Sequence, residues 1–277
     1  MLDLLRMELF RMRKMWAFFI VPLIFIVFLL IENITTSNIY SMSSDAFSLA
    51  ESKGIDSNDL EQIELLDQRF ELRIDAFTEY AELVPDTMHA LFLAIFTVLF
   101  AGAESSSGFI KSIGGQVSKR SKLMFSKLAA LGIFEIGFFV LTFAVNVVFE
   151  LIFFKQVRFD DPGRFAGFMG IQLLLHFCVI CFCMMVTIVT KSNMGGMILS
   201  LLTVLGFFNI IAVLLQRFWI STFEKSIDLL QFLMMENVSK LTYHSNGYAG
   251  HALAVCGVTG LISVALCCLS FEKRDMV

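Results

Sequence analysis

The sequence predicts an all-α, polytopic membrane protein with six transmembrane helices, as its composition, hydropathy pattern and charge distribution indicate. Of its 277 residues, 57% are hydrophobic and 17% are charged, whereas ordinary soluble domains average roughly 45–50% and 25%. A soluble globule of this size does not bury that much apolar surface, because its core grows slowly with chain length. The composition therefore excludes a soluble enzyme, a disordered protein and a disulfide-rich secreted module.

Six apolar stretches have nearly the length that a transmembrane helix needs, which is about 20 mainly apolar residues. The second is short, and we expect it to extend into its flanks. The first is a retained span rather than a cleaved signal, because no small-x-small cleavage site follows its long apolar run. Pro22 predicts a kink in it. The stretches are residues 15–32, 88–104, 128–150, 165–190, 194–216 and 249–271.

The basic residues predict that both termini lie in the cytoplasm and that the chain crosses the cytoplasmic membrane several times. Lys and Arg accumulate in cytoplasmic loops. With cytoplasmic termini, twelve basic residues fall in the short inside segments and nine in the much longer outside segments. The inside segments are then 1–14, 105–127, 191–193 and 272–277, and the outside segments are 33–87, 151–164 and 217–248.

Three segments outside the spans predict further helices within the single transmembrane domain that residues 1–277 form. Residues 1–14 fit an amphipathic helix in the cytoplasmic interface. Residues 33–87 carry twelve acidic residues and predict an extracellular helix from Asp56 to Pro85. Its charged face would contact a substrate or partner or, as the simpler interpretation, only solvent. Residues 217–248 are too polar to span and too apolar for a free loop, so we expect amphipathic or re-entrant helices.

The basic, serine-rich loop 105–127 predicts a short cytoplasmic helix within residues 105–120. Its three serines are expected to cap a helix that begins near Gly108, and the pair Gly114–Gly115 is expected to end it. Such a helix is a natural docking element for a partner. An ordinary positively charged inside loop is the alternative.

Motifs for catalysis, cofactors and nucleic acid are missing from the sequence. Neither a P-loop nor an HExxH motif occurs, so any use of ATP has to come from another chain. The cysteines at 178, 181 and 183 lie among apolar residues, where cysteine acts as a small hydrophobe. We therefore expect no enzyme activity, no bound cofactor or metal, and no nucleic-acid partner.

Polar and ionisable residues inside the spans are the candidates for a substrate path. Such residues are functional suspects by default, although they also join helices by hydrogen bonds. Glu32 and Glu150 lie near the outer surface, where we expect them to reach water. The path candidates are Glu135, Asn146, Gln172, His176 and Asn209.

Several motifs, in order along nearly the whole chain, resemble the membrane permease subunits of ABC-type exporters of the second export class. The opening LLRMELFRMRKMWAFF resembles the basic, hydrophobic start of that family. Glu104, Gly108, Lys111 and the run GGQVSKRSKLMFSKL resemble its loop between spans 2 and 3, and FEKRDMV resembles its C-terminal ending. The long acidic segment is most similar to members that handle peptides, such as bacteriocins, lantibiotics or phenol-soluble modulins.

The resemblance implies a mechanism of alternating access with several partners. ATP and Mg²⁺ would bind a separate ATPase subunit, and a second permease, identical or related, would complete the path through the lipid bilayer. The cargo would be amphipathic or hydrophobic, foremost a peptide. The residues implied to couple to the ATPase are Glu104, Ser106, Ser107, Gly108, Phe109, Ile110, Lys111, Ser112, Ile113 and Gly114.

Other functions remain open from the sequence. The same machine would also suit drugs, lipids, ions or a polysaccharide. An intramembrane enzyme would need paired groups at matching depth, for which Glu135 and His176 are the candidates. A sensor or immunity subunit would bind peptide at segment 33–87 without transporting it.

Overall fold

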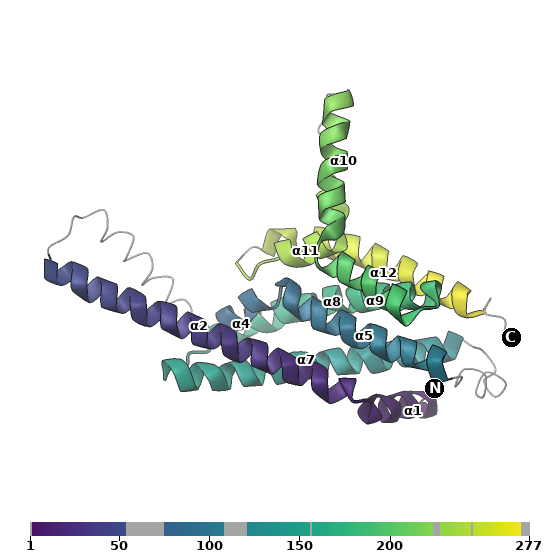
Figure 1. Ribbon diagram of the computed structural model, residues 1–277, viewed down its shortest axis with the longest axis horizontal. Coiled ribbons are helices and arrows are strands. Elements are labelled where there is room, and N and C mark those ends of the chain that lie inside the picture. The colour runs from purple at the N-terminus through teal and green to yellow at the C-terminus, as the bar shows by residue number, and fades with distance from the viewer. Residues whose placement is uncertain are drawn as a thin grey trace.

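The computed structural model describes residues 2–53, 75–107, 121–155, 157–223, 228–244 and 246–272, and their regular elements are helices (Figure 1). An isolated parallel β-bridge joins Asp75 to Arg158. The helices are α1 (Leu2–Lys14), α2 (Ala17–Lys53), α4 (Ala76–Leu83), α5 (Thr87–Ser107), α7 (Ser121–Phe154), α8 (Pro162–Thr190), α9 (Asn193–Val204), α10 (Phe207–Phe223), η1 (Leu230–Phe232), α11 (Met234–Lys240), η2 (Asn246–Tyr248) and α12 (Ala249–Glu272).

The described helices contain four to six candidate membrane spans, which confirms a helical, multi-pass architecture. Four helices are long and apolar enough to cross a bilayer alone: α2, α7, α8 and α12. Two further pairs qualify when each pair is taken together, namely α4 with α5, bent by 60°, and α9 with α10, bent by 59°. Counting each bent pair as one span gives six.

Most of the long helices follow one axis, with α8 in contact with α5, α9 and α12, and α2 in contact with α5 and α7 (Figure 1). Helix α1 packs against α7. The N- and C-termini lie at the same end of this axis, and α10 stands away from the other helices. The common end of the termini agrees with an even number of crossings.

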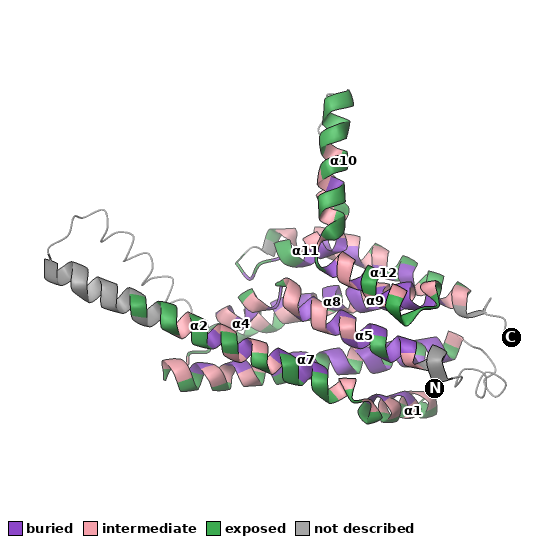
Figure 2. Ribbon diagram, in the orientation of Figure 1, coloured by how far each residue is buried: buried purple, intermediate pink, exposed green. Residues whose placement is uncertain are grey.

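Aromatic packing forms the larger of the two buried apolar clusters in the described residues. It joins α2, α5 and α7 around Phe25, Phe96 and Phe134, and the rings of Phe96 and Phe134 stack with centroids 3.6 Å apart. The second cluster joins α4, α5, α8, α11 and α12 and includes Met234 and Val238. Figure 2 shows the buried residues concentrated where the helices meet. The short helix α11 is therefore part of the core.

The segment after the first span differs from the sequence expectation. Helix α2 does not end near residue 32 but continues to Lys53. A single helix from Asp56 to Pro85 is wrong, because Asp75 is extended (φ −85°, ψ 108°) and caps α4 by accepting a hydrogen bond from the Thr78 amide. Asp75 also accepts a hydrogen bond from the Asp160 amide at 2.9 Å. It therefore holds the start of α4 against the segment before α8, whereas a helix that continued through residue 75 would separate them. Helix α4 ends before Pro85, as predicted.

The expected fifth span, residues 194–216, is broken in its middle. Helix α9 ends at Val204 and α10 begins at Phe207. Between them Gly206 has φ +76°, a left-handed conformation that glycine adopts without steric cost. This stretch is mainly apolar on both sides of Gly206, so hydropathy alone did not reveal the break.

Gly196 allows α8 and α9 to approach closely. An added Cβ there would lie 2.9 Å from the Thr187 Cα, whereas at Gly195 the nearest atom would be 3.5 Å away. We expect Gly196→Ala to lower the free energy of unfolding by about 1–3 kcal/mol through overpacking. Thermal unfolding in detergent measures the effect, with Gly195→Ala as the matched control. Equal stability of the two variants would contradict this packing.

Candidate functional site

The residues implied to couple to an ATPase fall at the edge of the described structure. Glu104, Ser106 and Ser107 belong to the last turns of α5. The other seven, from Gly108 to Gly114, lie outside the described residues. Because α5 continues through Ser107, the three serines expected to cap a following helix are the last residues of α5. The predicted helix itself lies outside the described residues.

Lys127 links the two helices that flank this loop. Its side chain, on α7, is 1% exposed, and its ammonium nitrogen lies 5.6 Å from the centroid of the Phe100 ring on α5. A cation over an aromatic face is attracted by the ring quadrupole. The adjacent residues Met124, Leu128 and Leu131 are also buried. Lys127 and Phe100 therefore give the end of α5 and the beginning of α7 a direct side-chain contact.

The five path candidates do not form one hydrogen-bonded network among the described residues. Among the described residues no hydrogen bond joins any two of them, apart from the contact of His176 Nδ1 with the Gln172 carbonyl oxygen at 2.9 Å. Asn146 contacts α2, Gln172 contacts the segment after α11, and Asn209 contacts α11 itself. The sequence identified these side chains, which are polar and largely buried, but it did not predict that they contact different segments of the protein.

Asn146 belongs to a buried chain of polar groups between α2 and α7. The Asn33 amide donates to Asn146 Oδ1 at 3.2 Å and to the Leu29 carbonyl at 3.0 Å. Asn146 in turn donates to the Glu150 carboxyl group. All three polar side chains are at most 3% exposed, so the expectation that Glu150 reaches water is wrong. The spacing of four residues between Asn146 and Glu150 signals a common helix face. Asn33, the partner of Asn146 on another helix, was not identified from the sequence.

Two fully buried histidines flank one aromatic ring of α7. The imidazoles of His89 on α5 and His176 on α8 lie 5.4 Å and 5.2 Å from Phe139, measured between ring centroids. One turn from His176, Gln172 Nε2 donates to the Leu241 carbonyl at 3.1 Å. These contacts connect α5, α7, α8 and the segment after α11. His89 was missed because nothing in its local sequence distinguishes it.

Glu135 is buried in the middle of α7, at 2% exposure. Its electrostatic neighbours across the helix interface include Cys178 and Cys181 of α8. No hydrogen bond or ion pair in the described part of the chain joins it to His176. The geometry therefore gives no support to these two residues as a catalytic pair.

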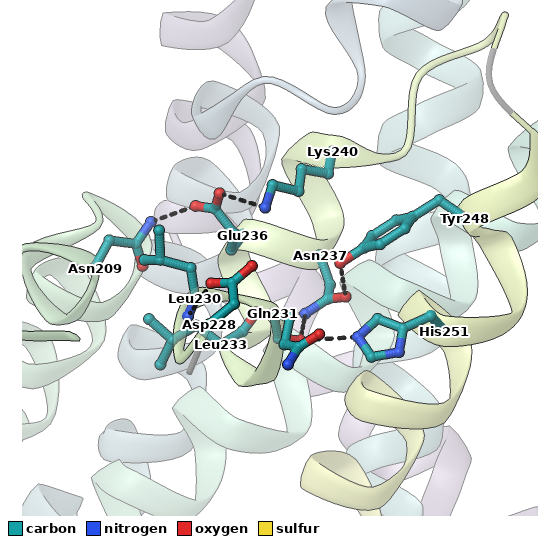
Figure 3. Close-up of polar contacts among 10 residues, drawn as sticks. All are labelled: Asn209, Asp228, Leu230, Gln231, Leu233, Glu236, Asn237, Lys240, Tyr248 and His251. Atoms are coloured by element: carbon teal, nitrogen blue, oxygen red, sulfur yellow. Dashed lines mark hydrogen bonds and ion pairs between the residues drawn. The ribbon is translucent and has the colours of Figure 1, made fainter. Parts of the chain in front are cut away.

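A dense set of polar contacts surrounds α11 (Figure 3). Asn237 donates to the carbonyl oxygens of Gln231 at 2.8 Å and Leu233 at 2.7 Å, and accepts from the Tyr248 hydroxyl at 2.9 Å. His251 Nε2 lies 3.0 Å from the same Gln231 oxygen. We call Gln231, Asn237, Tyr248 and His251 the α11 clamp. It fixes the irregular segment before α12.

Asn209 connects this region to the bend between α9 and α10 without being part of the clamp. Its amide donates to Glu236 Oε2 at 2.9 Å, and Glu236 Oε1 lies 3.2 Å from Lys240 Nζ. The hydrogen bond to Glu236 raises the pKa of Lys240 above its usual value. Glu236 therefore ties the first turn of α10 to α11, close to the break at Gly206.

Metal-ligating side chains do not converge in the described part of the chain. No group of three or more His, Cys, Asp or Glu residues there is placed to hold a metal ion. The six cysteines are free thiols, four of them buried. Most of these thiols are thus buried, and none in the described part of the chain belongs to a group placed to hold a metal ion.

If the α11 clamp orders residues 228–248, replacing Asn237 should measurably reduce the order of that segment. We expect Asn237→Ala to cost about 1–3 kcal/mol of stability, because it removes the side-chain donor to the Gln231 and Leu233 carbonyls and the acceptor of the Tyr248 hydroxyl. Tyr248→Phe should cost only about 0.5–1.5 kcal/mol, since it removes a single hydrogen bond. Hydrogen exchange of residues 228–248 checks this, and wild-type protection in Asn237→Ala would contradict the role of the clamp.

Comparison with known proteins identifies a family but no characterised relative. Residues 66–277 match the family model described as "Protein of unknown function (DUF2705)". No curated protein and no solved structure matches the chain. The match covers α4 to α12, and therefore the second buried cluster and the α5 and α7 side of the first, but not α1 and α2. Because it includes more than half of the sequence, the chain belongs to the DUF2705 family.

Proposed function

We propose that this chain is the membrane-spanning permease subunit of an ATP-driven ABC-type exporter. It carries no ATPase motif of its own and works with a separate ATPase chain, which binds ATP and Mg²⁺. A second permease, identical or related, completes the complex in the cytoplasmic membrane. The cargo is amphipathic or hydrophobic, foremost a peptide, and leaves the cell by alternating access.

The observation that carries the proposal is the gathering of basic segments at one end of the helix axis. Helix α1, the C-terminal end of α12 and the start of α7 lie at this end (Figure 1). Basic side chains on α1 and the first turns of α7 include Arg6, Arg13, Lys14 and Lys122. A concentration of positive charge is typical of the cytoplasmic face, which is where an ATPase would dock.

The full topology in this proposal has six spans and cytoplasmic termini. Each bent pair, α4 with α5 and α9 with α10, then crosses the membrane as one span. Helix α1 lies in the cytoplasmic interface, and α11 with its neighbouring short helices packs at the outer side. Irregular backbone at membrane depth is tolerated where protein covers it, and the clamp around Asn237 supplies that cover.

The proposed coupling runs from the loop after α5 into the paired helices α5 and α7. Because Lys127 and Phe100 pack the two helices together, a displacement of the loop moves both. Their other ends contact α2 and α8 through the aromatic cluster and the Asn33–Asn146–Glu150 chain. A nucleotide on the partner drives export only if it favours one of two packings of these helices.

Co-purification with the ATPase encoded beside this chain tests the proposal. We expect the wild-type chain to recover a stable complex whose ATPase rate depends on the permease. Adding a negative charge by Gly108→Asp and reversing one by Lys111→Glu, in the same variant, should lower recovery or coupling by about tenfold, as expected for loss of a charge-assisted contact.

Arg158→Gln provides the matched control, because Arg158 is basic and exposed but belongs to the segment bridged to Asp75. It should leave complex recovery unchanged. If no ATPase binds the wild-type chain, or if the loop variant behaves as the control does, the exporter assignment is wrong. Stimulation of the ATPase rate by candidate peptides then identifies the cargo.

A further inference from the structure

A deep apolar groove lies between α1, α2 and α7, apart from the polar groups described above. Its volume is about 810 Å³, within the range of roughly 300–1,000 Å³ typical of small-molecule sites. Twelve of its thirteen lining residues have no charge, and the exception is Arg13.

The groove exists because two residues keep side-chain atoms out of it. A Cβ added at Gly137 on α7 would meet no heavy atom within 4 Å. Opposite it, the compact ring of Pro22 is buried in α2. Phe18 and Phe134 close the inner side, with ring centroids 5.7 Å apart. The hollow is therefore built into the helix interface.

The groove opens toward the bilayer rather than into the helix bundle. Phe19 and Leu23 on its α2 side are 58% and 59% exposed, and Ile133 on its α7 side is 47% exposed. Since α2 and α7 are candidate spans, these exposed apolar side chains face hydrocarbon. An occupant would therefore enter sideways from the lipid phase.

Arg13 gives one end of this groove a positive charge. It is exposed at the last turn of α1, and no hydrogen bond or ion pair engages it among the described residues. Arg11, by contrast, is held by the Glu8 carboxylate at 3.2 Å. A guanidinium group presents a fork of donors that fits a phosphate group. The unengaged Arg13 therefore supplies what an anionic head group requires.

We propose that this groove binds an anionic phospholipid, with an acyl chain along α2 and α7 and the phosphate at Arg13. Each methylene group buried there adds favourable transfer free energy, and the charged end fixes the direction of the lipid. The net positive charge of α1 favours an anionic head group over a zwitterionic one. This site does not depend on the exporter assignment, because it uses none of the coupling or path residues.

Lipid retention and titration test the site with the full-length chain. The protein is purified in mild detergent, its co-purified lipids are counted by native mass spectrometry, and the delipidated protein is titrated with phosphatidylglycerol or phosphatidylcholine of matched acyl chains. Gly137→Phe fills the groove, and Arg13→Gln removes its charge. The controls are Gly170→Phe, at another exposed glycine with no atom within 4 Å of its Cβ, and Arg6→Gln, on the same helix but outside the groove.

We expect the wild-type chain to retain phosphatidylglycerol and to prefer it to phosphatidylcholine. Gly137→Phe should lose the retained lipid while keeping the wild-type thermal unfolding curve. Arg13→Gln should weaken phosphatidylglycerol binding by about tenfold to a hundredfold, as for one charge-assisted contact, and abolish the preference. Both controls should behave as wild type.

Three results would overturn the proposal. The first is a wild-type chain that retains no phospholipid and shows no saturable binding. The second is equal lipid binding by Gly137→Phe and wild type, which would place the lipid elsewhere. The third is an equal loss in Arg13→Gln and Arg6→Gln, which would indicate general attraction of lipid to α1.

Discussion

The absence of water from the bilayer interior is the constraint on which the rest of this structure depends. A backbone amide or carbonyl group at membrane depth has to find its partner within the protein, and helices satisfy this condition along their length. Where the chain leaves helical geometry, side chains take over. Asn237 does so for the carbonyl groups of Gln231 and Leu233, and Asp75 does so for the Thr78 and Asp160 amides. Polar side chains thus supply the hydrogen bonds that the irregular segments lack.

The interior combines two kinds of helix contact with different consequences. The aromatic cluster of α2, α5 and α7 is held by ring packing, which is adaptable because neighbouring rings have several favourable arrangements. The contacts of Asn33, Asn146 and Glu150, and those of the α11 clamp, require specific donors and acceptors. A change of packing that shifts the aromatic rings but keeps the polar contacts would let the helices joined by polar contacts move together. The bundle would then rearrange as a few rigid parts.

Helix type and order could be predicted from the sequence, because apolar runs of transmembrane length leave few alternatives. The breaks were harder to predict. Gly206 interrupts a uniformly apolar stretch, and nothing in its neighbours marks it as left-handed. Asp75 ends a helical pattern because it meets Asp160, 85 residues away in the chain. Among the site residues, Asn146, Gln172 and His176 were identified as polar groups inside spans, but their partners Asn33 and Leu241 depend on tertiary packing that no local pattern reveals.

Helix α2 is long in relation to the layer it crosses. Its 37 residues correspond to about 55 Å of helix, whereas the hydrocarbon core of a bilayer is about 30 Å thick. In Figure 1 its far end extends beyond the other helices. A helix of this length is a long arm in relation to the layer that it crosses. A small rotation near α1 would sweep its distant tip through a larger arc, so that a motion at one membrane surface is magnified at the other.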